Sequence, residues 1–196
     1  MEIVITGHTA GIGKALYDHF VNNGDKVIGL SRSNGYDIEN NFAEVVNTIK
    51  GCDLFINNTY RDQQQLKLFN AVKDSVSKIV CMGSISRLYP ELIPTDYVHD
   101  KQALYDACRL HNLTPDSCPV LHLDLAFIEN TNVEANDPTA FTSDNHITFA
   151  QIISAVDYWL ENPVITNIEF KWKCTPFVRS EFERINPNLD PSRITI

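Results

Sequence analysis

The stretch that most constrains the fold of this chain is its amino-terminal sequence, MEIVITGHTAGIGKAL. Residues 3–5 form an apolar run of the kind expected for a strand that is buried on both faces. Gly7, Gly11 and Gly13 follow, and apolar residues then return at helical spacing. A glycine-rich turn between a strand and a helix presents free backbone N–H groups and the positive end of the helix dipole to an anion. Three glycines also occur in ordinary loops, so this stretch alone leaves a dinucleotide site and a plain loop as alternatives.

Apolar strands and amphipathic helices alternate along the rest of the chain. The expected strands are residues 26–30, 53–56, 78–82, 119–123 and 164–170, and the expected helices are residues 42–49, 61–76, 96–110 and 149–160. This alternation predicts an α/β fold with a mainly parallel sheet that is covered by helices on both faces. Only Asn34 and Gly35 lie between the end of the strand at residues 26–30, with Ser31 to Ser33, and residues 36–38. This is too few residues for a helical crossover, so any third strand here is short and lacks its usual preceding helix.

The composition limits the class of protein. A chain of 196 residues with 43% hydrophobic residues is expected to form one domain with a real core. No apolar run is long enough to cross a membrane, and the amino terminus lacks the features of a secretory signal. The net charge of −9 argues against a nucleic-acid partner. The five cysteines are scattered without a CxxC pair, so we expect no metal site, no disulfide framework and a cytoplasmic location.

Polar or small residues follow the expected strands at the end where parallel sheets bind ligands. These residues are Thr6, Gly7, Ser31, Arg32, Asn57, Asn58, Ser84, Leu125 and Ala126. Further along the chain, Tyr97 and Lys101 lie one helical turn apart. A lysine ammonium beside a phenol favours the phenolate, which lowers the phenol pKa from about 10. Taken singly, Ser84 is an ordinary turn residue and Tyr97 a core aromatic, but at these spacings they predict an acid–base site.

Four motifs resemble those of the short-chain dehydrogenase/reductase family in order and spacing, over about residues 1–170. They are Thr6-Gly7-x-x-x-Gly11-Ile12-Gly13, Asn57-Asn58, Ser84 and Tyr97-x-x-x-Lys101. The resemblance implies a single-domain, doubly wound sheet of the Rossmann type that binds NAD(P), with residues 171–196 as an extension on or near the substrate side. It also implies an oxidoreductase that interconverts a carbonyl and a hydroxyl group on a small-molecule substrate. In such a site Tyr97 exchanges the proton with the substrate oxygen, Ser84 hydrogen-bonds that oxygen, and Lys101 also holds the nicotinamide ribose.

The end of the second strand predicts the cofactor. NAD-binding proteins of this shape place an acidic residue there to hold the ribose 2′-OH, whereas this chain has Ser31 followed by Arg32. Serine in place of the acidic residue removes the repulsion against a 2′-phosphate, and the guanidinium of Arg32 can bind that phosphate. We therefore expect NADP(H) as the cofactor. The alternative is that Arg32 is an ordinary solvated surface charge. The other cofactor contacts that the resemblance implies are Thr6, Gly7, Gly11, Ile12, Gly13, Asp37, Ile38, Asn57, Asn58, Tyr97, Lys101 and Ile128.

The chain departs from the family pattern at three places. The family's Asn-Asn-Ala-Gly is replaced by a stretch that ends in Thr59-Tyr60, which puts bulk where a glycine often lies near the cofactor. Leu125-Ala126 stands in place of the usual Pro-Gly. A further catalytic asparagine normally lies in the helix expected at residues 61–76, where Asn70 is the only asparagine.

Two questions stay open at this stage. The chain is shorter than full-length family members, and the trimmed helix is often a dimer surface, so a homo-oligomer is neither required nor excluded. A second reading of the function is a non-catalytic dinucleotide-binding sensor whose polar segment at residues 129–145 contacts a partner.

Overall fold

The computed structural model describes residues 1–88, 90, 95–126, 128 and 146–170. Within these residues one sheet contains six strands, which are all parallel and run in the order β2-β1-β3-β4-β5-β6. The strands are β1 (Glu2–Thr6), β2 (Lys26–Leu30), β3 (Leu54–Asn57), β4 (Ile79–Met82), β5 (Val120–Asp124) and β6 (Asn167–Glu169). The helices are α1 (Gly11–Asn22), α2 (Phe42–Ile49), α3 (Gln64–Val72), α4 (Asp96–Asn112) and α6 (Phe149–Glu161), with short 3-10 turns η1 (Arg32–Asn34) and η2 (Ile85–Leu88). The predicted doubly wound α/β fold of the Rossmann type is therefore confirmed.

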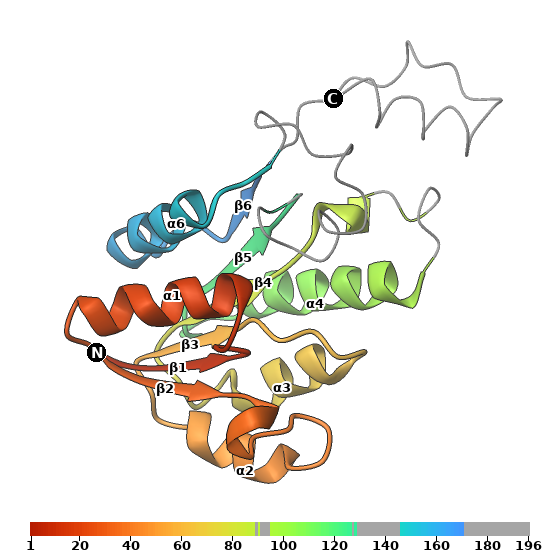
Figure 1. Cartoon of the computed structure of the whole chain (residues 1–196). Coiled ribbons are helices and arrows are strands. Elements are labelled where there is room, and N and C mark those ends of the chain that lie inside the picture. Colours follow the sequence, from red (N-terminus) through yellow and green to blue (C-terminus); the bar gives the residue numbers. More distant parts are fainter. Residues whose placement is uncertain (89, 91–94, 127, 129–145, 171–196) are drawn as a thin grey trace, which may run out of the picture.

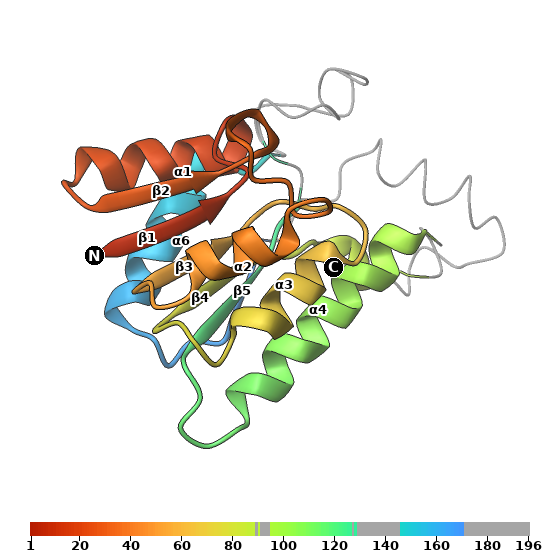
Figure 2. The same cartoon turned by 90° about the horizontal axis from the view of Figure 1, so that it is seen from below.

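Helices cover the sheet on both faces (Figures 1 and 2). On the face under α1 and α6, Phe20 and Trp159 pack against the strands with almost no exposed surface. On the face under α2, α3 and α4, Phe69 and Leu104 do the same. Because side chains alternate between two buried faces, the central strands are apolar at nearly every position, and β1 has no exposed residue from Ile3 to Ile5.

Most of the expected elements are confirmed with ends shifted by a few residues. The bounds of β2 and α2 agree with the sequence prediction, and β6 is shorter than expected.

Thr148 and Gln151 form the capping box that their spacing predicts at the start of α6. The backbone N–H of Gln151 donates to Thr148 Oγ1 at 3.2 Å, and that of Thr148 donates to Gln151 Oε1 at 2.9 Å.

No third strand forms at residues 36–38, where the sequence left room only for a short one. The chain turns instead through η1, which ends at Gly35 with a φ of 90°. Asn34 stabilises this turn because its side chain accepts from the N–H of Ser31 at 2.9 Å and donates to Gly29 O at 2.8 Å. Such side-chain bonds to nearby backbone compete with pairing in a sheet. Since no strand follows, β2 is the edge of the sheet.

Some expectations fall on residues that the structure does not describe. The polar segment at residues 129–145 and the extension at residues 171–196 lie outside the described part of the chain. Within that part, Cys52, Cys81, Cys108 and Cys118 are free thiols. A membrane-spanning helix would have to be long and continuously apolar, and none of the described helices is.

Gly13 determines how closely α1 approaches the turn after β1. A Cβ at this position would lie 2.2 Å from Gly7 O and 2.7 Å from Asn58 Nδ2. The first of these atoms belongs to the backbone and cannot turn away. Glycine at position 13 is thus required by packing, in addition to any role beside a ligand.

We predict that Gly13→Ala lowers the free energy of unfolding by about 1–3 kcal/mol, the usual cost of overpacking. Urea unfolding followed by circular dichroism measures this. Gly29→Ala is the matched control, because the three atoms nearest to its added Cβ all belong to the side-chain ring of His8 and none belongs to the backbone. Equal costs for the two variants would contradict the packing role of Gly13.

Candidate active site

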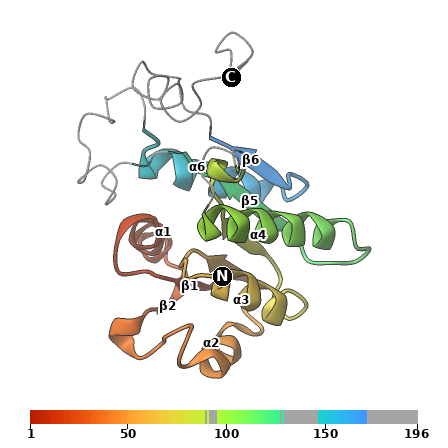
Figure 3. The same cartoon turned by 90° about the vertical axis from the view of Figure 1, so that its right-hand side faces the viewer.

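A cleft of about 640 Å³ opens where β1, β2 and β3 end. Figure 3 views the molecule from the side toward which the strands point. The walls come from the glycine-rich turn, from η1 and the turn after it, and from the segment that follows β3. The lining residues are Gly7, Thr9, Leu30, Ser31, Arg32, Ser33, Tyr36, Asp37, Ile38, Glu39, Thr59, Tyr60 and Arg61. Five predicted cofactor contacts, Gly7, Ser31, Arg32, Asp37 and Ile38, are therefore brought together in one cleft.

The amino terminus of α1 adjoins this cleft and has the features of an anion site. Its cap residue, Ala10, forms no side-chain hydrogen bond, and the first turn contains no acidic residue. The first N–H that bonds back to the cap is that of Lys14, which donates to Ala10 O at 3.2 Å. The N–H groups of Gly11, Ile12 and Gly13 precede it and have no partner within the helix. They can donate to an anion at the positive end of the helix dipole.

Arg32 is the cation of the cleft that forms no salt bridge within the described residues, although its charge helps to lower the pKa of Asp37. Its side chain is exposed, and its guanidinium has no hydrogen-bond or ion-pair partner among the residues that the structure describes. Arg61, also on the cleft wall, donates from Nε to Glu39 Oε2 at 3.2 Å. Asp37 accepts from the Glu39 N–H and from Asn40 Nδ2, both at 2.9 Å, and these bonds lower its pKa. Arg32 is thus the side chain that remains available to a phosphate.

Three predicted cofactor contacts lie behind the cleft rather than on its wall. Thr6 Oγ1 accepts from the N–H of Asn58 at 3.0 Å and from that of Thr59 at 3.1 Å, and Asn58 Nδ2 donates to Thr6 O at 3.0 Å. Asn57 is fully buried and donates from Nδ2 to Gln65 O at 3.0 Å. These side chains hold the ends of β1 and β3 in place, and their contact with a cofactor stays a prediction.

Ile128 is not among the residues that line the cleft. It forms a bridge with Ile147 and packs, partly buried, against the apolar cluster under α1 and α6. Its contact with a cofactor also stays a prediction.

Ser84 and Tyr97 are brought together although thirteen residues separate them. Ser84 lies in the turn after β4, and Tyr97 lies in the first turn of α4 with 36% of its surface exposed. Burial raises the pKa of the Tyr97 phenol above its ordinary value of 10, and a hydrogen bond with Ser84 lowers it by less. The phenol pKa is therefore above its ordinary value, and the expectation that it is lowered is wrong for this structure, because burial outweighs what favours the phenolate.

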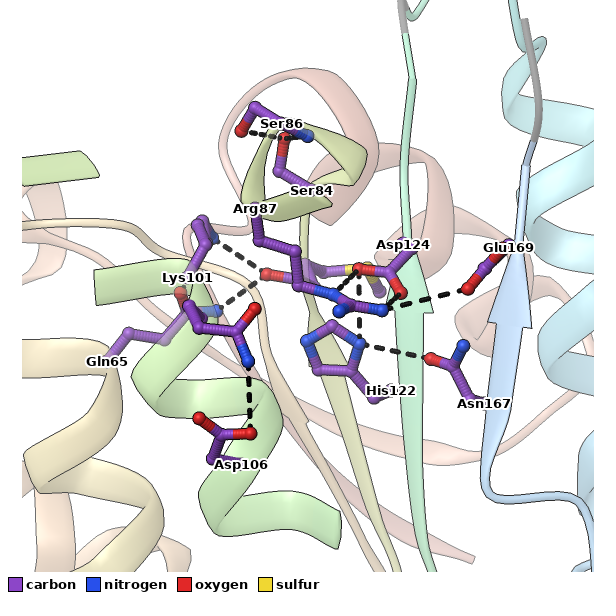
Figure 4. Close-up of polar contacts among 12 residues, drawn as sticks. Gln65, Ser84, Ser86, Arg87, Lys101, Asp106, His122, Asp124, Asn167 and Glu169 are labelled. Carbon is purple, nitrogen blue, oxygen red and sulfur yellow. Dashed lines mark hydrogen bonds and ion pairs between the residues drawn. The ribbon is translucent and has the colours of Figure 1, made fainter. Parts of the chain in front are cut away.

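Lys101 is buried, with 3% of its surface exposed. Its ammonium donates to Gln65 Oε1 at 2.7 Å and to Met82 O at 2.8 Å (Figure 4). The Nζ atom lies 5.5 Å from the centre of the Tyr97 ring, so it acts on the ring through space and not through a hydrogen bond. Burial lowers the pKa of Lys101 to about 8.

Gln65 is the residue of this site that the sequence reasoning missed. Besides accepting from Lys101, it donates from Nε2 to Asn57 O at 2.8 Å and to Met82 O at 3.1 Å. It is almost fully buried, whereas Asn70 on the same helix is exposed. The sequence signal that could have indicated Gln65 is the run of glutamines at residues 63–65, which begins six residues after Asn57 at the end of β3. Gln65, not Asn70, is the α3 amide that contacts the lysine.

Tyr60 connects the cleft to these residues. It lines the cleft, its ring packs edge-on against Tyr97 with 4.8 Å between centres, and Lys101 Nζ lies 5.1 Å from its ring. Its hydroxyl donates to Asp100 Oδ2 at 3.1 Å. The bulk expected at this position from the sequence is therefore placed between the cleft that Tyr60 lines and the ammonium of Lys101.

Known structures share this fold. No family model matches the sequence, and a search of curated proteins gives no match.

The 3-alpha-hydroxysteroid dehydrogenase from Pseudomonas sp. B-0831, complexed with NADH, is 14% identical over 86% of this chain and 95% of its own, with a TM-score of 0.64. A short-chain dehydrogenase from Streptomyces avermitilis is 15% identical over 95% of this chain and 93% of its own, with a TM-score of 0.63. A putative NAD(P)-dependent gluconate 5-dehydrogenase from Beutenbergia cavernae, with bound NADP, is 14% identical over 86% of this chain and 94% of its own, with a TM-score of 0.67. At the level of the fold, these likenesses support the resemblance to short-chain dehydrogenases/reductases that the motifs indicate.

The burial of Lys101 predicts a specific dependence of stability on pH. Its pKa in the folded protein, about 8, is below its unfolded value of 10.5. Between these values the unfolded chain binds more protons, so the contribution of Lys101 to the free energy of unfolding rises with pH. Relative to Lys101→Met, the unmodified protein should gain on the order of 3 kcal/mol across this window.

Urea unfolding of both proteins at several pH values from 7 to about 10.5 measures this difference. Other groups that titrate in the same range, such as buried cysteines, contribute to both proteins and cancel in the comparison. A difference that stays constant with pH would show that Lys101 keeps an ordinary pKa in the folded state.

Proposed function

We propose that this protein is an NADP(H)-dependent oxidoreductase that interconverts a carbonyl and a hydroxyl group on a small-molecule substrate. The observation that carries the proposal is that Ser84, Tyr97 and Lys101 meet at the edge of a parallel sheet, next to a cleft with an unpaired arginine. Similar structures with bound NADH or NADP support a nicotinamide cofactor.

The residues present fit the adenosine and phosphate parts of such a cofactor. The free N–H groups at the start of α1 suit a pyrophosphate, and Gly7 keeps the adjoining turn narrow because a Cβ there would meet Thr59 Oγ1 at 2.4 Å. Arg32 suits a 2′-phosphate because a planar guanidinium can form two parallel hydrogen bonds to it. The nicotinamide part would lie toward Tyr97 and Lys101, with Tyr60 moved aside. When bound, NADPH supplies the hydride.

The chain's own residues then supply the proton. The raised pKa of Tyr97 keeps its phenol protonated at neutral pH, so its Oη can donate to the substrate oxygen during reduction. Ser84 can donate a second hydrogen bond to the same oxygen. Since the pKa of Lys101 is about 8, its ammonium is mostly charged at neutral pH and stabilises the phenolate that remains after transfer.

A second candidate function is dinucleotide binding without turnover. The observation that favours it is the position of Tyr60 over Lys101, whose ammonium already has two hydrogen-bond acceptors. A protein of this kind would bind NADPH tightly and reduce no carbonyl compound. The complete set of serine, tyrosine and lysine favours the enzyme, because a sensor needs no proton donor.

We predict that Tyr97→Phe abolishes turnover and leaves the NADPH dissociation constant nearly unchanged. The variant keeps the ring and loses the proton donor, and a positioned acid–base group contributes about 10²–10⁴-fold to the rate. A panel of aldehydes and ketones is screened first with the unmodified protein by NADPH absorbance, and the best substrate is then used.

Tyr158→Phe is the matched control, because Tyr158 is an exposed phenol on α6. Undiminished turnover in Tyr97→Phe would rule out Tyr97 as the proton donor. Tight NADPH binding with no turnover on any carbonyl by the unmodified protein would favour the second candidate.

Arg32 should set the preference for NADP(H). A hydrogen bond to a charged group is worth about 1.5–3 kcal/mol, so Arg32→Ala should weaken NADPH binding roughly 10- to 100-fold and leave NADH binding unchanged. Ser31→Asp should shift the preference further, because a carboxylate repels the 2′-phosphate and offers the 2′-OH of NADH an acceptor. Calorimetry at one ionic strength measures both dissociation constants.

Arg109→Ala is the control for the loss of one positive charge, because Arg109 is exposed near the end of α4 and does not line the cleft. Equal affinity of the unmodified protein for NADH and NADPH would contradict the role of Arg32. Melting temperatures of all variants show whether the η1 turn, in which Ser31 takes part, is still intact.

A further inference from the structure

A buried ion pair that the proposed reaction does not use lies next to Ser84 (Figure 4). Arg87 Nε donates to Asp124 Oδ1 at 2.8 Å, and Nη2 donates to the other carboxylate oxygen. The two side chains are 5% and 0% exposed. The contact is bidentate, so it holds the guanidinium in one orientation as well as at one distance.

Other groups enclose the guanidinium on its remaining sides. Its central carbon lies 3.6 Å from the centre of the Tyr105 ring, and Nη2 lies 3.7 Å from Glu169 Oε1. His122 contributes Nδ1 at 3.5 Å from Asp124 Oδ1, and burial lowers its pKa to about 4, so it is neutral at physiological pH. The arginine therefore joins η2, β5, β6 and α4.

Stability alone does not explain this arrangement. Taking two charges out of water costs about as much as their attraction returns, and well-packed apolar side chains of similar volume often stabilise a protein equally or better. An ion pair also fixes the relative orientation of its two side chains, because a guanidinium and a carboxylate meet in only a few geometries. The position of Arg87 and Asp124 in the fold indicates which segments this fixed orientation holds in place.

The pair fixes the turn that carries Ser84. The N–H of Arg87 donates to Ser84 O at 3.3 Å, and the Ser84 hydroxyl lies 2.8 Å from that of Ser86. The turn is also tied to the strand beside it, since the N–H of Ile85 donates to Leu125 O at 3.1 Å. Arg87 and Ile85 are the two buried residues of η2.

The same arginine connects the turn to the helix that carries the other two residues of the site. Tyr97, Lys101 and Tyr105 are spaced by four residues along α4 and therefore share one face of that helix. Arg87 packs on Tyr105 at the inner end of this row. Its guanidinium thus sets the distance between the Ser84 turn and the face of α4 that presents Tyr97.

We propose that Arg87, held by Asp124 and packed on Tyr105, is a positioning residue that fixes the turn carrying Ser84 against the face of α4 that carries Tyr97 and Lys101. The consequence for catalysis rests on the proposed function. The placement itself is a property of the chain alone and can be measured without cofactor or substrate.

The test is the titration of Tyr97 by NMR, with tyrosine labelled at the ring carbon that bears the hydroxyl and the signal assigned by its loss in Tyr97→Phe. Ser84→Ala removes the hydrogen bond that lowers the phenol pKa, so the titration should move to higher pH. Arg87→Lys should move it in the same direction, because an ammonium keeps the charge but not the bidentate contact. The variant that combines Ser84→Ala with Arg87→Lys should titrate at the same pH as Ser84→Ala alone, because both changes act on one hydrogen bond.

Val156→Ala is the matched control, because it weakens the core under α6 on the other face of the sheet and should not move the titration. Arg87→Met combined with Asp124→Leu removes the pair without leaving a buried charge, so it tests the proposal even where Arg87→Lys does not fold. This double variant is also expected to move the titration to higher pH. Once a substrate is known, both Arg87 variants should lower kcat and leave the NADPH dissociation constant unchanged.

Two results would overturn the proposal. In the first, Ser84→Ala moves the titration of Tyr97 and the Arg87 variants do not. In the second, none of the variants moves it, which would mean that Ser84 does not bond to Tyr97. A failure of the unmodified protein to bind NADPH would count against the proposed function and leave this measurement unaffected.

Discussion

All strands end at the same edge because every pairing in the sheet is parallel. Beyond that edge, side chains hold the backbone in addition to a few backbone hydrogen bonds such as that from Ile85 to Leu125. Thr6 accepts from two N–H groups that follow β3. Gln65 and Lys101 both donate to the last carbonyl of β4. Arg87 ties the turn after β4 to Asp124 at the end of β5. The candidate site is built from the residues that close this edge, so its geometry and the stability of the sheet are coupled.

The burial of Lys101 at this edge determines both the reach of its charge and its pKa. An ammonium in contact with water would be screened, whereas one buried beneath two tyrosine rings acts across a low-dielectric interior. The cost is a pKa lowered by burial, which Gln65 and the Met82 carbonyl partly offset by accepting its hydrogen bonds. Tyr60 both lines the cleft and lies 5.1 Å from the lysine, so it is the side chain that connects the two.

The edge of the sheet at β2 shapes the other half of the site. A further strand beyond β2 would bury the segment that follows it. The η1 turn, locked by Asn34, instead leaves Arg32 exposed on the cleft wall without a partner among the described residues. The edge strand itself is only five residues long and begins with Lys26, which pairs with Glu2 on its neighbour. Short, charged edges of this kind resist pairing with another chain.

The sequence by itself determined the alternation of strands and helices, the glycine-rich turn and the spacing of Ser84, Tyr97 and Lys101, because hydrophobic period and backbone freedom are local properties. It did not show that residues 36–38 form no strand, since pairing depends on a partner that the local pattern does not contain. Only the tertiary structure decided that Gln65 holds Lys101. It likewise decided that the phenol pKa of Tyr97 is raised, because desolvation depends on what the rest of the fold packs around a group.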